Sequence, residues 1–130
     1  MEPIHIRVLI ELALFTALRR GELVGLKWSD IDFEKQQLTV KRSIYKPKGE
    51  NAIEKEPKTH SSIRTISIPN CLCETLQYYK KKQAENSLSL GERWKNLDYL
   101  FTDEFGNVTN PQTPTKQLSK FLERHNIRHL

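Results

Sequence analysis

The sequence predicts an α+β domain that is mostly helical and carries a small three-stranded antiparallel sheet. A nearly continuous apolar run from Ile4 to Leu18 indicates a helix that is central to a core. Residues 37–44 and 63–68 alternate between apolar and polar side chains, which is the period of a half-buried strand. The 130 residues suffice for one domain with a modest core.

The first predicted helix ends at a cationic corner. Arg19 and Arg20 follow the apolar run, and residues 21–26 predict a second, shorter helix that closes on Trp28, a candidate core plug. A charge at the end of a buried helix costs desolvation free energy unless it has a partner, and Glu22 is the nearby carboxylate. Because the rigid fork of a guanidinium suits a phosphate, the corner is a candidate anion site.

Two acidic residues, Asp30 and Asp32, follow this second helix in a predicted turn. Aspartate side chains in turns commonly bond to their own backbone. Two acids at this spacing also suggest a metal, but no third ligand is nearby in the sequence. We therefore expect turn chemistry and no metal site.

Three strands joined by two hairpins come next. The strands span residues 38–44, 52–56 and 63–68, and the polar connections between them contain proline or glycine. Arg42 falls on the apolar register near the end of the first strand, where we expect a sheet edge or groove to solvate it.

Two further helices are predicted in the second half of the chain. Asn70 is a good N-cap for a helix that ends close to the lysine run 80–82, where positive charge suits the helix dipole. Residues 87–96 lack a clear pattern and predict a connection. Thr113 is expected to cap the last helix, with Pro114 at its first position.

The charge distribution favours a polyanionic partner. The net charge is +5, and residues 41–66 contain seven Lys or Arg against three Glu, so this segment holds four of the five excess positive charges. Such a face suits a DNA backbone, although a solvated hairpin has the same composition.

The cysteines and the hydropathy of the sequence argue against a disulfide-rich protein, a zinc protein and a membrane protein. Cys71 and Cys73 are too close for an ordinary disulfide framework and have no zinc-binding pattern around them, which fits a reduced cytosolic protein. Arg7 and Glu11 interrupt the longest apolar run, and no signal peptide is evident, so no membrane segment is expected.

Two motifs resemble those of the tyrosine recombinases, the phage-integrase family. Residues 16–23, Thr-Ala-Leu-Arg-Arg-Gly-Glu-Leu, followed by Gly-Leu-Lys-Trp-Ser-Asp-Ile-Asp at 25–32, resemble the first arginine box, with Ala17 where the family usually has glycine. Residues 58–69, Lys-Thr-His-Ser-Ser-Ile-Arg-Thr-Ile-Ser-Ile-Pro, resemble the family β-hairpin, Lys-Thr-x-x-Ser-x-Arg-x-Ile-x-Ile-Pro. The motifs occur in the family order, and the resemblance covers nearly the whole chain.

The resemblance implies a role for three residues. Arg19 matches the first catalytic arginine, and Glu22 matches the glutamate that supports the box. Lys58 matches the lysine that acts as general acid toward the leaving 5′ oxygen. In the family a tyrosine attacks a DNA phosphodiester to give a 3′-phosphotyrosyl link, and two arginines stabilise the charge on phosphorus. No metal or other cofactor is implied.

The expected partner is double-stranded DNA, with candidate DNA-binding residues Arg20, Lys41, Arg42 and Arg64. Recombinases of this type act as tetramers on paired DNA sites, so the resemblance implies a homo-oligomer for the complete protein. It also implies a protein encoded by a bacterium or phage that works on DNA in the cytoplasm.

A third sequence that resembles a family motif lies at the end of the chain. Residues 125–129 spell His-x-x-Arg-His, close to the second catalytic box of the family. That box normally follows an extended apolar-aromatic segment, whereas His125 continues directly from the last predicted helix, so we do not assign His125 and Arg128 as catalytic. No tyrosine follows. We expect residues 1–130 to be the N-terminal part of a catalytic domain, without the core-binding domain, and inactive alone.

Two other classes of function remain open. A non-catalytic DNA-binding regulator with a helix-turn-helix explains the charge and the arginine corner, but it does not predict the Lys58 hairpin. A protein-interaction scaffold that keeps this fold and binds no DNA is the third hypothesis.

Overall fold

The chain forms a helical body with two small antiparallel sheets, described here by a computed structural model over residues 4–46, 49, 53–55, 63–109 and 113–124. The helices are α1 (Ile4–Thr16), α2 (Arg20–Val24), α3 (Asn70–Leu90) and α4 (Thr113–Arg124), with short 3-10 turns η1 (Trp28–Asp30) and η3 (Gly91–Arg93). The strands are β1 (Ile31–Asp32), β2 (Gln37–Val40), β3 (Ser43–Tyr45), β4 (Ile53–Lys55) and β5 (Arg64–Ser67). The predicted α+β class is confirmed.

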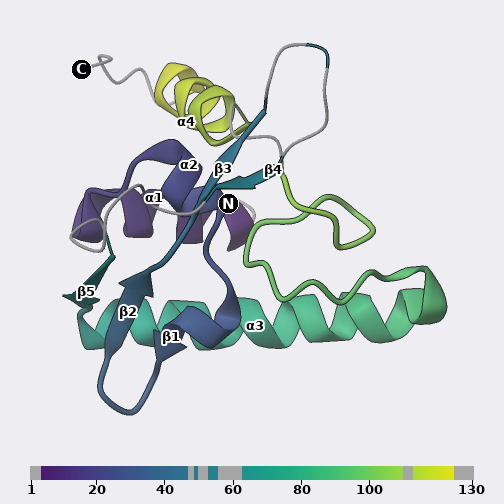
Figure 1. The fold of residues 1–130 in the computed structure, drawn as a ribbon, viewed down its shortest axis with the longest axis horizontal. Coiled ribbons are helices and arrows are strands. Elements are labelled where there is room, and N and C mark those ends of the chain that lie inside the picture. Colours follow the sequence, from purple (N-terminus) through teal and green to yellow (C-terminus); the bar gives the residue numbers. More distant parts are fainter. Residues whose placement is uncertain (1–3, 47–48, 50–52, 56–62, 110–112, 125–130) are drawn as a thin grey trace.

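The helix α1 is central to the packing. The long helix α3 runs along one side of the molecule, α1 contacts it, and α4 contacts α1 from the other side (Figure 1). Val8 and Leu12 of α1 are completely buried against a core that includes Leu38 of β2 and Leu72 and Leu76 of α3. Burial of each such side chain stabilises the fold by about 1.5–3 kcal/mol.

Trp28 closes this core next to α3, as predicted. It is buried, and its indole N–H donates to Gln83 Oε1 at 2.8 Å. The Nε2 group of Gln83 in turn donates to the carbonyl oxygen of Leu100 at 3.0 Å. One amide side chain of α3 therefore satisfies polar groups of two distant segments. Within the described part of the chain, no helix is long and apolar enough to cross a bilayer.

The three-stranded antiparallel sheet is present, but its predicted membership is wrong. The observed order is β1-β2-β5, while β3 and β4 pair with each other in a separate two-stranded sheet. The strand expected over residues 38–44 is interrupted at Lys41 and Arg42. Residues 31–32, expected in a turn, supply the third strand, because buried Ile31 pairs with buried Leu38.

Two predictions about α3 are also wrong in detail. The helix continues to Leu90, so the lysine run 80–82 lies inside it, and Gly91 with φ +59° follows the last residue. Asn70 starts the helix but does not cap it. Its side chain accepts from Gln36 and donates to Glu74, and Pro69 holds the N-cap position. Of the two cysteines, Cys73 is buried, Cys71 is exposed, and neither forms a disulfide.

A tight corner joins α1 to α2. Ala17 lies in the left-handed region with φ +54°, which ends α1 and turns the chain toward Arg19. The helix α2 then approaches β3 so closely that a Cβ on Gly21 would lie 2.4 Å from Ser43 Oγ and 2.9 Å from the carbonyl oxygen of Ile44. Glycine is therefore required at 21, and the conformation at 17 explains why the family motif usually has glycine there.

The left-handed conformation of Ala17 predicts a stabilising substitution. Ala17→Gly should raise the free energy of unfolding by about 1 kcal/mol, because glycine adopts a positive φ without the steric cost that alanine carries. Urea denaturation followed by circular dichroism measures this change. Ala13→Gly, inside α1, is the matched control and should lower stability by about 1 kcal/mol. Loss of stability in both variants would contradict the assignment.

Candidate active site

The corner between α1 and α2 is built around the backbone of Arg19. Arg19 occupies the N-cap position of α2 with extended φ/ψ, and its N–H donates to Glu22 Oε1 at 3.0 Å. This bond satisfies one of the backbone donors that every helix start exposes. The side chains of Arg19 and Arg20 are both exposed. The corner therefore presents two cations on a backbone that Glu22 holds.

Glu22 is also bound by a guanidinium from the sheet. Arg64 of β5 donates from Nη1 to Glu22 Oε2 and from Nη2 to Glu22 Oε1, both at 2.9 Å. The pair is partly removed from solvent, since the Glu22 side chain is 15% exposed and that of Arg64 is 41% exposed. Hydrogen bonding by Arg64 lowers the pKa of Glu22, and the same contact raises the pKa of Arg64.

This arrangement corrects one expectation and brings three predicted site residues together. Glu22 does not pair with the corner guanidiniums, as the sequence suggested; its ionic partner is Arg64, and it touches Arg19 through the backbone. Arg19, Glu22 and Arg64 thus form one connected group from α2 and β5. Lys58, six positions before Arg64 in the sequence, lies outside the described residues, as do His125 and Arg128.

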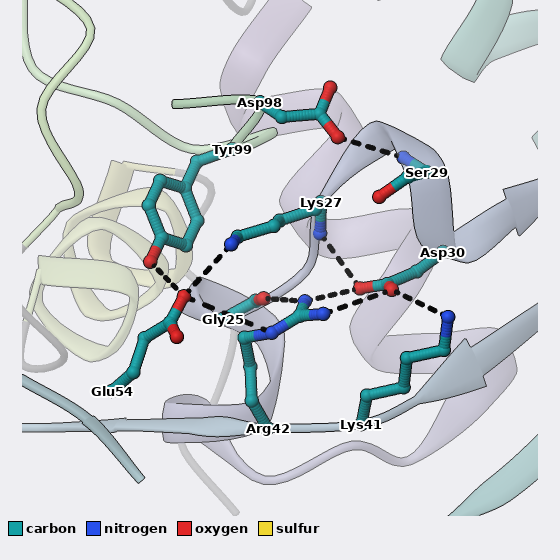
Figure 2. Close-up of polar contacts among 9 residues, drawn as sticks. All are labelled: Gly25, Lys27, Ser29, Asp30, Lys41, Arg42, Glu54, Asp98 and Tyr99. Atoms are coloured by element: carbon teal, nitrogen blue, oxygen red, sulfur yellow. Dashed lines mark hydrogen bonds and ion pairs between the residues drawn. The ribbon is translucent and has the colours of Figure 1, made fainter. Parts of the chain in front are cut away.

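A second ionic group lies between α2 and the strands. Arg42 donates from Nη1 to Asp30 Oδ2 at 2.6 Å and to the carbonyl oxygen of Gly25 at 2.8 Å (Figure 2). The side chain of Asp30 is 1% exposed and that of Arg42 is 15% exposed. Asp30 also accepts from the backbone N–H of Lys27 at 3.0 Å, as expected for an aspartate in a turn. Likewise Asp32 accepts from the backbone N–H of Lys35.

Arg42 is therefore not solvated at a sheet edge, and that expectation is wrong. Its buried ion pair with Asp30 explains the break between β2 and β3, because the chain bends so that this side chain reaches inward. Lys41, next to it, is exposed and lies 3.7 Å from Asp30 through its Nζ. The sequence held a usable signal, since an arginine on an apolar register needs a buried partner.

Glu54 joins β4 to the same group. Its Oε1 accepts from the hydroxyl of Tyr99 and lies 3.0 Å from Lys27 Nζ and 3.9 Å from Arg42 Nε, so Arg42 lies between two carboxylates (Figure 2). Hydrogen bonds from Tyr99 and Lys27 lower the pKa of Glu54, while burial and Glu54 raise the pKa of Tyr99. No sequence signal singled out Glu54 or Tyr99.

One cavity of the described residues is separate from the candidate site. A cavity of about 560 Å³ lies between α1, α3 and residues 94–109, lined among others by His5, Gln83 and Phe101. Arg19, Arg20 and Arg64 are not among its lining residues. Across the described ranges, no group of three or more His, Cys, Asp or Glu side chains could hold a metal ion.

Comparison with known proteins gives one family. The model of the phage integrase family matches residues 1–130. The chain is 40% identical over 144 aligned residues to a tyrosine recombinase XerC-like protein of Caldanaerobacter subterraneus subsp. tengcongensis, covering 96% of this chain and 37% of that one. It is 36% identical over 89 residues to the ICEBs1 integrase of Bacillus subtilis, covering 68% of this chain and 24% of the integrase.

Solved structures show the same fold. The Tn1549 transposon integrase in complex with circular intermediate DNA superimposes with a TM-score of 0.75 at 23% identity, over 92% of this chain and 38% of that one. The XerA recombinase superimposes with a TM-score of 0.68 at 18% identity, over 97% of this chain and 36% of that one. This chain thus spans less than half the length of the relatives it matches.

The buried Asp30–Arg42 pair predicts a large effect from removing one partner. Arg42→Ala should lower the free energy of unfolding by about 3 kcal/mol, because it leaves a buried carboxylate without its guanidinium. Urea denaturation measures the loss. The matched control is Arg7→Ala, which removes a 64% exposed arginine that lies 3.9 Å from Glu11 and should cost less than about 1 kcal/mol. Equal losses in the two variants would contradict the structural role of Arg42.

The lowered pKa values of Glu22 and Glu54 predict acid lability. Both values fall below the ordinary 4.5, so in acid the unfolded chain binds more protons than the folded one. The contribution of these carboxylates is complete above pH about 4.5 and is lost as the pH falls through their lowered folded-state pKa values. Urea midpoints between pH 7 and pH 3 test this. Glu22→Gln should flatten the dependence, and an unchanged profile would refute the contribution of Glu22.

Proposed function

This chain belongs to the phage integrase family, and from that membership we propose that the protein containing it recombines double-stranded DNA at specific sites. The reaction cleaves and rejoins strands through a phosphotyrosyl intermediate. In this proposal residues 1–130 are the N-terminal part of the catalytic domain, and the tyrosine comes from chain outside them.

One contact within the described residues carries the proposal for the site. The carboxylate of Glu22 binds the backbone of Arg19 and the guanidinium of Arg64 at once. Arg64 starts β5 and belongs to the same motif, residues 58–69, as Lys58. The two motifs that resemble recombinase boxes are therefore tied to each other by a single side chain, which favours a shared active site over two independent surface features.

Each residue then has a chemical task. The exposed guanidinium of Arg19 binds non-bridging oxygens and neutralises the charge that builds on phosphorus, a task worth on the order of 10²–10³ in rate for one such donor. The tyrosine oxygen forms a bond to phosphorus while the bond to the 5′ oxygen breaks. Lys58 donates a proton to that leaving oxygen, which contributes about 10²–10⁴ in rate. Glu22 fixes the corner that carries Arg19.

The partners follow from the same proposal. The XerH recombinase has been solved bound to its difH substrate, and the Tn1549 integrase in complex with transposon DNA. By analogy, duplex DNA is the substrate, Arg20 and Lys41 contact its backbone, and the complete protein assembles as a tetramer on paired sites. The bacterial origin of the relatives favours action on DNA in the cytoplasm.

Cleavage of a suicide substrate by the complete gene product tests the proposal. Arg19→Ala and Lys58→Ala should each slow formation of the covalent protein–DNA adduct at least about 10²-fold while duplex binding persists. A 5′-bridging sulfur in the substrate should rescue Lys58→Ala alone, because a thiolate leaves without a proton. Lys81→Ala, which removes an exposed lysine of α3 outside residues 41–66, is the control and should cut normally.

Other outcomes would replace the proposal. Weaker binding of Arg19→Ala and Lys58→Ala, in a protein that never forms an adduct, would indicate a DNA-binding regulator. If the protein shows no salt-dependent binding to duplex DNA, a protein-interaction scaffold would be the better interpretation. A covalent adduct on residues 1–130 alone would refute the placement of the nucleophile outside them.

A further inference from the structure

We propose that Arg64 is a positioning residue for Arg19 that acts through Glu22, and not a DNA-contacting residue. This inference rests on the proposed function, because it concerns the geometry of the arginine that binds the reacting phosphate. The sequence alone placed Arg64 among the candidate DNA contacts. The structure assigns it a different task.

The bonds form a continuous path from the sheet to the helix corner. Glu22 Oε1 receives Arg64 Nη2 at 2.9 Å and the backbone N–H of Arg19 at 3.0 Å, and Glu22 Oε2 receives Arg64 Nη1 at 2.9 Å. With both oxygens engaged by a planar fork, the orientation of the carboxylate is fixed. The oxygen that Arg19 needs is therefore held in place by Arg64.

The backbone of Arg64 is paired with a strand that contributes to the core. It is the register partner of Val40 in the antiparallel pair of β2 and β5, and Val40 is buried in the core. The corner on the other side of Glu22 is anchored by the buried side chains of Leu18 and Leu23, but its backbone carries a strained positive φ at Ala17. The ion pair with Arg64 thus adds a link from the sheet to the carboxylate that binds the backbone N–H of Arg19.

The same bonds make Arg64 a poor phosphate ligand. Two of its five N–H donors, one on each terminal nitrogen, bind Glu22, and its charge is opposed by a carboxylate at hydrogen-bond distance, which weakens its attraction for a phosphate. A DNA backbone contact would contribute to the salt dependence of binding, with a slope change of about 1 when it is removed. A positioning residue would instead change the rate of cleavage and leave that slope unchanged.

The test compares Arg64→Ala with Arg19→Ala and with the control Arg7→Ala in the complete gene product. Under single-turnover conditions with saturating suicide substrate, Arg64→Ala should slow adduct formation roughly 10-fold to 100-fold, because a small misplacement of a catalytic group has that effect. The salt slope of duplex binding should not change. Arg64→Lys should recover part of the rate, and Arg7→Ala should match the wild type.

A charge exchange separates positioning from mere stabilisation. The double variant Glu22→Arg with Arg64→Glu restores an ion pair between α2 and β5 but leaves no carboxylate for the Arg19 N–H. Positioning predicts that stability to urea recovers while cleavage stays slow. Recovery of both, or a slope change of about 1 in Arg64→Ala, would overturn the inference.

The outcomes also distinguish this inference from the proposed function. If Arg19→Ala abolishes cleavage and Arg64→Ala cuts like the wild type, the inference fails and the proposed function stands. If Arg19→Ala cuts normally, both fail.

Discussion

The arrangement of the strands depends on the buried ion pair between Asp30 and Arg42. Arg42 reaches inward to a carboxylate that is 1% exposed, and the bend this requires divides one expected strand into β2 and β3. The second half then lies against α2, where Gly25 offers its carbonyl oxygen to the same guanidinium. A buried aspartate is costly without a partner, and the bend between β2 and β3 brings Arg42 to it.

In the candidate site, the carboxylate of Glu22 links distant segments as Asp30 does in the core. Glu22 links residues that are three and 42 positions away in the sequence, the backbone of Arg19 and the side chain of Arg64. Sheet and helix corner are thereby fixed relative to each other by charge-assisted bonds that are strong only where water is partly excluded. The proposed role of Arg19 in binding phosphate would thus depend on a contact between α2 and β5 that Glu22 makes.

Local patterns were sufficient for part of this structure. The apolar run predicted α1, the short apolar pattern after Arg20 predicted α2, and alternation predicted strands over residues 37–44 and 63–68, because each signal depends on neighbouring residues. The choice of strand partners and the ionic partner of Glu22 depend on residues far apart, and no local pattern marks which of them pair. The length of α3 was underestimated because residues 87–90 alternate Ser with Leu, none of them is buried, and the apolar face of the helix does not continue through them. Arg42 is the exception. It lies on the apolar face of a predicted strand, which implies a buried acidic partner, and Asp30 is close enough in the sequence to be that partner.

The ionic groups also reduce the positive charge that residues 41–66 present at the surface. The positive excess of residues 41–66 suggested a basic DNA-binding face, yet two of its arginines are directed to carboxylates outside that segment. Arg42 is neutralised by Asp30 and Arg64 by Glu22. The field that this segment presents to a polyanion is therefore weaker than its composition implies. Arg19 and Arg20, by contrast, are exposed on the corner that Glu22 holds, so the predicted phosphate site keeps two accessible cations.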